Sequence, residues 1–343
     1  MRTRPSRTRL ERSLKWLSQL QLPPLTDVHV HLAALPTADN GCRLSRRMRK
    51  SPLTRFLAWT QGLPMDDPQT ANRRYVENLE RELRASNRVG RAVLLAMDGV
   101  YDSTGALDES RTDFLISNDH VFEVARGNER FLPGVSINPT RRDALDELER
   151  CAEKGAALVK VLPNAQVFDP ADRRLVPFYS ALARLRLPLL SHVGYEFSLI
   201  GQDQAVGDPG RLRAALDEGV SVIAAHGCSS GLFIREPHFP TMLDLVRRYP
   251  NFYVDTSALT IPNRVGVLFR LRRHPEIFDR LIFGTDYPLP VWAYPCMGAL
   301  DWRGYGQART AMNRFDRQAV ILDRLGISCG AKLPGRLDVA SPR

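Results

Sequence analysis

The stretch Leu25-Thr26-Asp27-Val28-His29-Val30-His31 decides how the rest of the chain is understood. Its alternating residues predict a β-strand, in which side chains two positions apart lie on the same face. His29 and His31 would therefore project together, close enough to bind one metal ion. A short His-x-His pattern also arises by chance at the end of an ordinary strand. The remainder of the chain has to distinguish a metal site from two unrelated histidines.

The composition is that of a soluble globular protein. Of the 343 residues, 43% are hydrophobic and 25% are charged, and no apolar run approaches the roughly 20 residues that span a bilayer. Five scattered cysteines without a Cys-x-x-Cys pair favour reduced thiols over disulfides, zinc fingers or iron–sulfur clusters. No apolar segment follows the basic N-terminus, which argues against a secretory signal. We therefore expect a cytoplasmic protein that does not associate with membranes.

The net charge of +10 is concentrated near the N-terminus, where residues 1–50 hold 11 Lys/Arg and 3 Asp/Glu. The basic runs Arg2–Arg12 and Arg43–Lys50 are compatible with solvated arms, with a rim that attracts anions, or with a polyanion contact. No nucleic-acid-binding motif accompanies them, so we do not expect nucleic acid as a partner. The sequence does not settle the oligomeric state, and a homodimer is among the possible assemblies.

From residue 25 onward, apolar strands alternate with amphipathic helices. The predicted strands cover residues 25–31, 91–97, 131–137, 156–162, 187–192, 220–225, 252–256 and 281–284. Near-continuous apolar strands indicate burial on both faces, as in a parallel sheet covered by helices. Eight such units predict a single (β/α)₈ TIM barrel. A doubly wound open sheet is the alternative, but no Gly-rich phosphate loop follows any strand.

The expected organisation is a basic N-terminal extension over residues 1–24, a barrel over 25–325 and a C-terminal tail over 326–343. Leucines at helical spacing predict a short amphipathic helix in the extension, which Pro23-Pro24 would end. Residues 32–88 form a long first connection, predicted as a polar basic loop and then a helix over 72–86. Long connections of this kind often cover active sites. The last helix is expected over 310–325.

Residues with metal-binding or acid–base chemistry recur at the C-terminal ends of the predicted strands, where barrel enzymes carry their catalytic groups. Four of the seven histidines end such a strand. The complete set is His29 and His31 after the first strand, Lys160 in the fourth, His192 after the fifth, His226 after the sixth and Asp286 after the eighth. This recurrence favours a metal site over chance.

The pattern resembles the amidohydrolase superfamily over about residues 25–325, and most closely its amidohydrolase-2 branch of TIM-barrel metal-dependent hydrolases. That branch includes aminocarboxymuconate semialdehyde decarboxylase and several lactonases. The motifs that carry the resemblance are Val-Lys-Val-Leu-Pro (159–163), Leu-Leu-Ser-His-Val-Gly (189–194), Val-Ile-Ala-Ala-His-Gly (222–227) and Ile-Phe-Gly-Thr-Asp-Tyr-Pro (282–288). One departure is His226-Gly227-Cys228, where many members of the branch have His-Cys-Gly, and it weakens placement in a particular subgroup.

The resemblance implies a ligand set for one divalent ion, most often zinc, with manganese and ferrous iron as alternatives. The implied ligands are His29, His31, His192 and Asp286. Asp286 would also accept a proton from the metal-bound water, whose pKa is drawn toward about 7. His226 would act beside that water as a base or electrostatic partner, or would only orient the ligands.

The substrate contacts are less defined by the sequence. Lys160 is expected to bind an anionic substrate group or to form an ion pair inside the barrel. A second metal ion is expected only if Lys160 is carbamylated and bridges two ions. Tyr195 and Trp292, which follow strand ends, are candidate substrate contacts or packing residues. The basic segment Arg43–Lys50 would favour an anionic substrate if it folds inward over the mouth of the barrel.

The expected function is hydrolysis of a small amide, lactone or ester, possibly an anionic one, through a metal-activated water. A non-oxidative decarboxylase of the same branch is the first alternative and would use much the same ligands. A distant alternative is a non-catalytic binding protein that uses its basic arm on nucleic acid.

Overall fold

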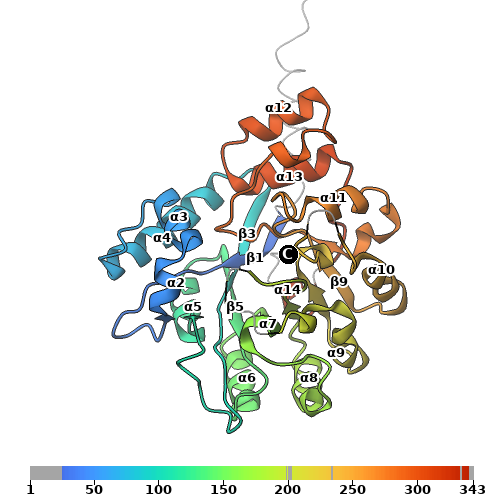
Figure 1. Ribbon diagram of the computed structural model, residues 1–343. Helices are drawn as coiled ribbons and strands as arrows, with labels where there is room; N and C mark the ends of the chain where they lie inside the picture. Colours follow the sequence, from blue (N-terminus) through green and yellow to red (C-terminus); the bar gives the residue numbers. More distant parts are fainter. Residues whose placement is uncertain (1–24, 198, 200–202, 233–234, 333, 340–343) are drawn as a thin grey trace, which may run out of the picture.

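Eight parallel strands form the barrel that the strand pattern predicts (Figure 1). In this computed structural model, which describes residues 25–197, 199, 203–232, 235–332 and 334–339, the strands are hydrogen-bonded in chain order. They are β1 (Leu25–His31), β3 (Val89–Leu95), β5 (Phe131–Ser136), β6 (Leu158–Val161), β7 (Leu189–Ser191), β8 (Val222–Ala224), β9 (Phe252–Asp255) and β10 (Leu281–Ile282). The barrel closes between its ends, where Val28 N donates to Phe283 O (3.1 Å) and Asp286 N to His29 O (2.9 Å). The predicted TIM barrel is confirmed.

Helices surround the strands (Figure 1). The longer ones are α4 (Pro68–Arg84), α5 (Asn118–Ala125), α6 (Ala144–Glu153), α8 (Val176–Arg184), α10 (Phe239–Arg248), α11 (Val265–Leu271), α12 (Trp302–Thr310) and α13 (Arg314–Arg324). Shorter helical segments are α7 (Pro163–Gln166), α9 (Arg213–Asp217), α14 (Arg336–Val339), η1 (Arg173–Leu175), η2 (Ala205–Gly207), η3 (Pro209–Leu212), η4 (Ala225–Cys228), η5 (Pro275–Arg280) and η6 (Tyr294–Cys296). Among the described residues, no helix has the length and apolar character required to cross a bilayer.

The helix predicted over residues 310–325 begins later in the structure, and α14 follows it. The sequence pattern predicts one helix over 310–325, whereas α12 ends at Thr310 and α13 begins at Arg314. Asn313 causes the break, because its side-chain oxygen accepts a hydrogen bond from Asp316 N (2.8 Å) and caps α13. The helix predicted in the N-terminal extension, within residues 1–24, lies outside the described residues.

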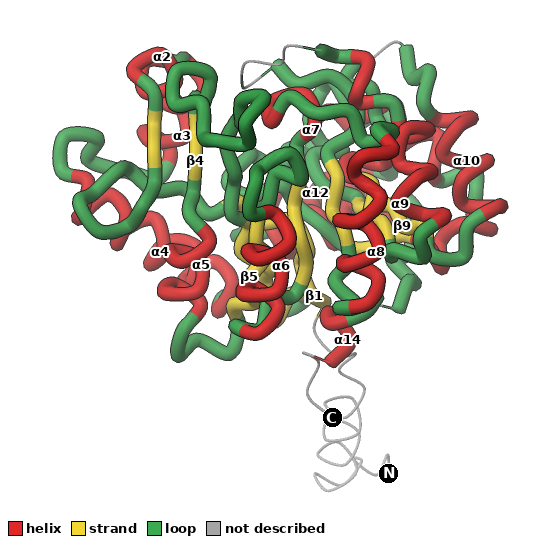
Figure 2. The backbone as a smooth tube through the Cα atoms, turned by 90° about the horizontal axis from the view of Figure 1, so that it is seen from below, coloured by secondary structure: helices red, strands yellow, loops and turns green. Residues whose placement is uncertain are grey.

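Two apolar layers hold the barrel together. One lies between the strands and the surrounding helices, and the other fills the barrel interior with Val28, Leu95, Leu190 and Ile223. Leu337 of α14 is fully buried against this interior layer, so part of the segment predicted as a tail packs into the barrel. Figure 2 shows α14 at the end of the barrel opposite to α2 and β4.

The first connection was predicted to begin as a polar loop, and this prediction is wrong. It folds into β2 (Arg43–Leu44), α2 (Arg46–Lys50) and α3 (Pro52–Thr60) ahead of α4. β2 pairs antiparallel with β4 (Phe114–Leu115), which belongs to the next connection. Ser45 and Ser51 begin the two helices, their hydroxyl oxygens accepting from Met48 N (3.0 Å) and Thr54 N (3.1 Å). The resulting β2–β4 ladder rises above the barrel on the side of α2 (Figure 2).

Candidate metal centre

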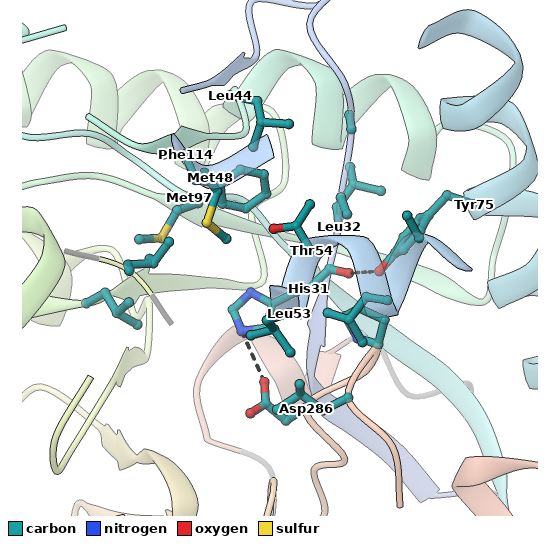
Figure 3. A pocket seen from close by; sticks show the side chains of 18 of the residues that line it. His31, Leu32, Leu44, Met48, Leu53, Thr54, Tyr75, Met97, Phe114 and Asp286 are labelled. Atoms are coloured by element: carbon teal, nitrogen blue, oxygen red, sulfur yellow. Dashed lines mark hydrogen bonds and ion pairs between the residues drawn. The ribbon is translucent and has the colours of Figure 1, made fainter. Parts of the chain in front are cut away.

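The two histidines of β1 meet the carboxylate that follows β10. His31 Nε2 lies 3.2 Å from Asp286 Oδ1 (Figure 3), and His29 Nε2 lies 3.3 Å from His31 Nε2 and 3.5 Å from Asp286 Oδ1. One ligand atom from each of the three residues lies within 4.8 Å of the other two. Two imidazole nitrogens and a carboxylate oxygen in this arrangement suit a divalent zinc, manganese or iron ion. The barrel thus brings together residues that are far apart in the chain.

His192 and His226 form a second pair beside this group. His226 Nε2 lies 3.2 Å from His192 Nδ1, and His226 Nδ1 lies 3.8 Å from Asp286 Oδ2. His192 is not part of the 4.8 Å group, but its Nε2 is buried and has no hydrogen-bond partner among the described residues. Glu196 Oε2 lies 3.9 Å from this nitrogen, beyond hydrogen-bond distance. A buried imidazole nitrogen without a hydrogen bond fits a metal ligand.

Asp255, the last residue of β9, organises all three buried histidines. Its Oδ2 lies 2.7 Å from His29 Nδ1, so His29 donates from Nδ1 and keeps the Nε2 lone pair for an ion. Its Oδ1 accepts from the Ser257 hydroxyl, whose oxygen lies 2.9 Å from His226 Nδ1. His226 then donates from Nδ1 and accepts at Nε2 from His192 Nδ1, which leaves the lone pair on His192 Nε2.

Sequence reasoning missed Asp255, although it follows the same rule that selected Asp286. Asp255 lies near the end of the predicted strand 252–256, and Asp286 follows the predicted strand 281–284, both at the mouth of the barrel. The signal was therefore present in the sequence, in the segment Phe252-Tyr-Val-Asp-Thr256. Its role was not, because no residue near Asp255 in the chain indicates that its carboxylate faces His29, 226 positions away.

The charges in the site match those that metal binding requires. Burial lowers the pKa of His29, and it lowers the pKa of His192 and His226 well below the ordinary histidine value. Burial pushes the pKa of Asp286 upward, but the neighbouring histidines outweigh it and hold that pKa well below its usual range. The pKa of Asp255 is also lowered, because His29 and the Ser257 hydrogen bond outweigh burial. These directions favour neutral imidazoles at His29, His192 and His226 and ionised carboxylates at Asp255 and Asp286.

Lys160, in β6, lies fully buried beside the ligands. Its Nζ is 3.4 Å from His29 Nε2, and burial lowers the lysine pKa to about 8. The carboxylates of Asp255 and Asp286 oppose this shift by favouring the charged form. The structure therefore places Lys160 against the proposed ligands and within the lining of the cavity described next.

A cavity of about 290 Å³ opens above these residues. One side is polar and carries His31, Lys160, His192, His226 and Asp286. The other side is apolar and comes mainly from the first connection, with Leu44, Met48 and Leu53, and from Phe114 of β4 (Figure 3). This volume is at the lower end of the range for sites that hold small molecules.

The two aromatic residues predicted to contact substrate, Tyr195 and Trp292, differ in their position relative to the cavity. Tyr195 lines the cavity, whereas Trp292 is not among its lining residues. The indole of Trp292 instead lies against Tyr294, with ring centroids 5.5 Å apart. Trp292 is thus half-buried against Tyr294, outside the cavity lining, and a substrate contact by Trp292 stays a prediction.

The basic segment Arg43–Lys50 does lie over the cavity, but its positive charges do not enter it. Arg43 pairs with Glu109 (2.7 Å), and Arg47 lies 3.5 Å from Asp113. Leu44 and Met48 line the cavity instead. β2 and α2 thus turn their apolar side chains toward the cavity, and attraction of an anionic substrate by this segment stays a prediction.

Arg264, at the start of α11, is a lining residue that sequence reasoning missed. Its side chain is buried, and its guanidinium donates to Ser229 O (3.1 Å) and Tyr195 O (3.4 Å). It lies in a loop several residues beyond β9, so no strand-end rule selects it. Only the folded barrel shows that this arginine reaches the cavity.

Two of the site residues have left-handed backbone conformations. His226 has φ 59° and Asp286 has φ 66°, values that residues other than glycine rarely adopt. Such conformations cost about 1–3 kcal/mol each and cluster at functional sites, where the surrounding structure holds them. Asp286 N is held in place by its hydrogen bond to His29 O (2.9 Å). These unfavourable backbone conformations place the side chains of His226 and Asp286 in the site.

Comparison with known proteins identifies the family. Residues 26–303 match the model of the amidohydrolase family (Amidohydro_2). The chain belongs to the amidohydrolase family. The resemblance predicted from the motifs is thereby confirmed, and membership of this family of metal-dependent proteins points to an enzyme. Among curated proteins, none matches this amidohydrolase.

Solved structures share the fold of this amidohydrolase at low sequence identity. An uncharacterized TIM-barrel protein from Bordetella bronchiseptica is 18% identical, with a TM-score of 0.59 and coverage of 93% of this chain and 100% of that chain. A putative 2-pyrone-4,6-dicarboxylic acid hydrolase from Pseudomonas putida is 15% identical, with a TM-score of 0.52 and coverage of 93% and 97%. A 2,6-dihydroxybenzoate decarboxylase is 16% identical, with a TM-score of 0.50 and coverage of 88% and 96%.

Proposed function

We propose that this amidohydrolase is a metal-dependent hydrolase that cleaves an amide, lactone or ester bond in a small molecule. The observation that carries the proposal is the convergence of His29, His31 and Asp286 at the polar side of the cavity. His192 supplies the fourth ligand, because its buried Nε2 makes no hydrogen bond among the described residues and keeps a lone pair, with Glu196 Oε2 at 3.9 Å. The donor set is compatible with zinc, manganese or ferrous iron, and zinc is our choice for the first loading experiment.

A divalent ion bound by these residues would lower the pKa of a coordinated water to about 7. Asp286 is ionised and lies at the cavity wall, so it is the acceptor for the proton that the attacking water releases. His226, whose Nδ1 lies 3.8 Å from Asp286 Oδ2, stabilises that carboxylate as its protonation changes. The apolar side of the cavity excludes competing water from the reacting bond.

Isotope incorporation tests the reaction. Metal-loaded protein is incubated with a panel of amides, lactones and esters in ¹⁸O-labelled water, and the product acid is analysed by mass spectrometry. We expect one labelled oxygen per product, loss of turnover on chelation and recovery when the ion is restored. Turnover that survives complete removal of the metal, checked by elemental analysis, would refute the proposal.

Matched variants test the residues. Asp286→Asn and His31→Gln should each reduce turnover at least 100-fold, roughly the contribution of a positioned acid–base or ligand group. His274→Gln is the control, because His274 pairs with Glu276 (2.8 Å) and does not line the cavity. Equal losses in His274→Gln and His31→Gln would show that the effect does not arise at the site.

Non-oxidative decarboxylation is the second candidate, and the apolar lining of the cavity favours it. A carboxylate that loses CO₂ disperses its charge, so an environment poor in water lowers the cost of the reaction. The similar solved structures do not choose between the two reactions, because the Pseudomonas putida protein is named as a hydrolase and the 2,6-dihydroxybenzoate protein as a decarboxylase. Release of CO₂ without incorporation of labelled oxygen would establish decarboxylation and refute hydrolysis.

A further inference from the structure

The helix α3 (Pro52–Thr60) carries large apolar side chains on two opposite faces. Leu53 and Leu57, one helical turn apart, line the cavity. On the outward face, Phe56 and Trp59 are 41% and 78% exposed, and their ring centroids lie 6.4 Å apart. A surface helix normally turns charged and polar side chains away from the core. Two neighbouring aromatic rings exposed on that face therefore indicate that another surface covers it.

The chain around these rings is strongly basic. Residues 43–65, which include α2 and α3, hold six Lys/Arg and no Asp/Glu, and Asp66 is the first acidic residue after them. Figure 1 shows α2 and α3 together at one edge of the barrel, beside α4. Arg43 and Arg47 pair with acidic residues of the next connection. The other four cations form no ion pair within the described part of the chain; they are Arg46, Arg49, Lys50 and Arg55.

Two arginines flank the exposed rings. Arg55 precedes Trp59 by four positions, so the two exposed residues lie on the same side of α3. Arg74 of α4 donates to Gly62 O, and Gly62 N donates to Trp59 O (3.0 Å). The surface formed by Arg55, Phe56, Trp59 and Arg74, named the α3 outer face below, therefore combines aromatic rings with positive charge.

Charge selects the partner of the α3 outer face. A second copy of this chain, related by a two-fold axis, would bring the same cations against it, and like charges in contact are unfavourable. The basic extension of residues 1–24 is disfavoured for the same reason. An anionic bilayer accommodates both the cations and the rings, because tryptophan and phenylalanine beside Lys/Arg suit the boundary between headgroups and acyl chains. A nucleic-acid duplex accommodates only the cations.

We propose that the α3 outer face binds the surface of an anionic phospholipid membrane. The cations of α2 and α3 contact the lipid headgroups, and Phe56 and Trp59 enter the boundary between headgroups and acyl chains. Such a peripheral contact needs no membrane-spanning segment, and it differs from the expectation, drawn from composition, of a protein that does not associate with membranes. It goes beyond the proposed function, because it requires neither a metal ion nor turnover.

Vesicle flotation tests the proposal with the whole chain. Vesicles of phosphatidylcholine alone are compared with vesicles of equal parts phosphatidylcholine and phosphatidylglycerol. We expect at least about tenfold tighter binding to the mixed vesicles, because each Lys/Arg near an anionic surface contributes about fivefold in affinity. Binding should weaken as the salt concentration rises, since salt screens exposed charges. Equal binding to the two kinds of vesicle, or binding to neither, overturns the proposal.

Matched substitutions assign the binding to the α3 outer face. Trp59→Ser should weaken binding to the mixed vesicles about tenfold, the contribution of one partly buried aromatic side chain. Arg55→Gln should weaken it about fivefold. Trp302→Ser and Arg303→Gln are the controls, because Trp302 is also 78% exposed and Arg303 lies over its ring (5.1 Å), but on a different helix. Both controls should bind as the wild type does.

Quenching of tryptophan fluorescence by brominated phosphatidylcholine in the mixed vesicles gives an independent measurement. Trp59→Phe should reduce the quenching, whereas Trp302→Phe should not. Wild-type affinity in both Trp59→Ser and Arg55→Gln would place the membrane contact in another segment, such as the basic extension, and overturns the proposal. Wild-type protein that self-associates or binds a DNA duplex through Trp59, and does not bind the mixed vesicles, identifies a different occupant and also overturns it.

Discussion

Replacing Asp255 with asparagine should weaken metal binding at His29 while leaving the barrel folded. Three donors point at one oxygen of this carboxylate: His226 N (2.8 Å), Ser257 N (3.0 Å) and the Ser257 hydroxyl. These three donors will hold the single side-chain oxygen of the asparagine at the position that Oδ1 of Asp255 now occupies. The new amide nitrogen then faces His29 Nδ1 in place of Oδ2, at the position that now accepts at 2.7 Å.

This substitution reverses the hydrogen bond to His29. Because the amide group is a donor, His29 has to accept at Nδ1 and carry its proton on Nε2, the atom that lies 3.5 Å from Asp286 Oδ1. The Nε2 lone pair is then lost to the ion. Changes to such outer partners cost about 10- to 100-fold in metal affinity, which corresponds to roughly 1.4–2.7 kcal/mol. The branch through Ser257 to His226 is unchanged.

Zinc affinity is measured by competition with a chromophoric chelator, and circular dichroism checks the fold. Asp316→Asn is the control, because Asp316 also accepts several hydrogen bonds, among them Ser86 Oγ (2.6 Å) and Asn87 N (3.2 Å), but lies outside the cavity lining. An affinity of folded Asp255→Asn within about twofold of wild type would refute the tautomer argument.

Three further predictions concern stability. Zinc at about 100 times its Kd should stabilise the protein by about 2.7 kcal/mol and raise the thermal midpoint, and a chelator should reverse this. Gly194→Ala should cost roughly 2 kcal/mol or more, because Gly194 has φ 92° and an added Cβ would lie 2.1 Å from Ser229 O. The third concerns His238. Burial lowers the pKa of this histidine from 6.5, so its protonation favours the unfolded chain. His238→Gln should therefore reduce the loss of stability as pH falls below 6.5.

Each of these has a matched comparison. Magnesium in place of zinc should give a smaller midpoint shift, because it prefers oxygen ligands; equal shifts would argue against an imidazole-rich site. Gly219→Ala has φ 81° but open space around the added atom, so urea unfolding should show a smaller loss than for Gly194→Ala. For His238→Gln, urea midpoints at about pH 7 and about pH 5 should differ less than in wild type. A difference as large as in wild type would place the pH sensitivity in the other buried histidines, His29, His192 and His226.

Much of this molecule could be predicted from the order of its residues alone. The eight apolar segments, the alternation in Leu25–His31 and the helical spacing between them are local patterns, and local patterns determine which secondary structure each segment forms. Because a parallel barrel brings all strand ends to one mouth, the strand-end histidines and Asp286 could be placed in one site before any distance was known. The motifs that carry the family resemblance lie at the ends of these same strand segments.

Only the tertiary structure decided which side chains meet across the cavity. The pairing of Asp255 with His29, and the burial of Arg264 against Ser229 and Tyr195, join residues separated by tens to hundreds of positions. The basic segment over the mouth shows the same limit, because its charge was visible in the sequence but the direction of its side chains was not. That direction depends on the pairing of β2 with β4, a contact between two different connections of the barrel. Local periodicity carries no information on such contacts, so the identity of the cavity walls could come only from the folded chain.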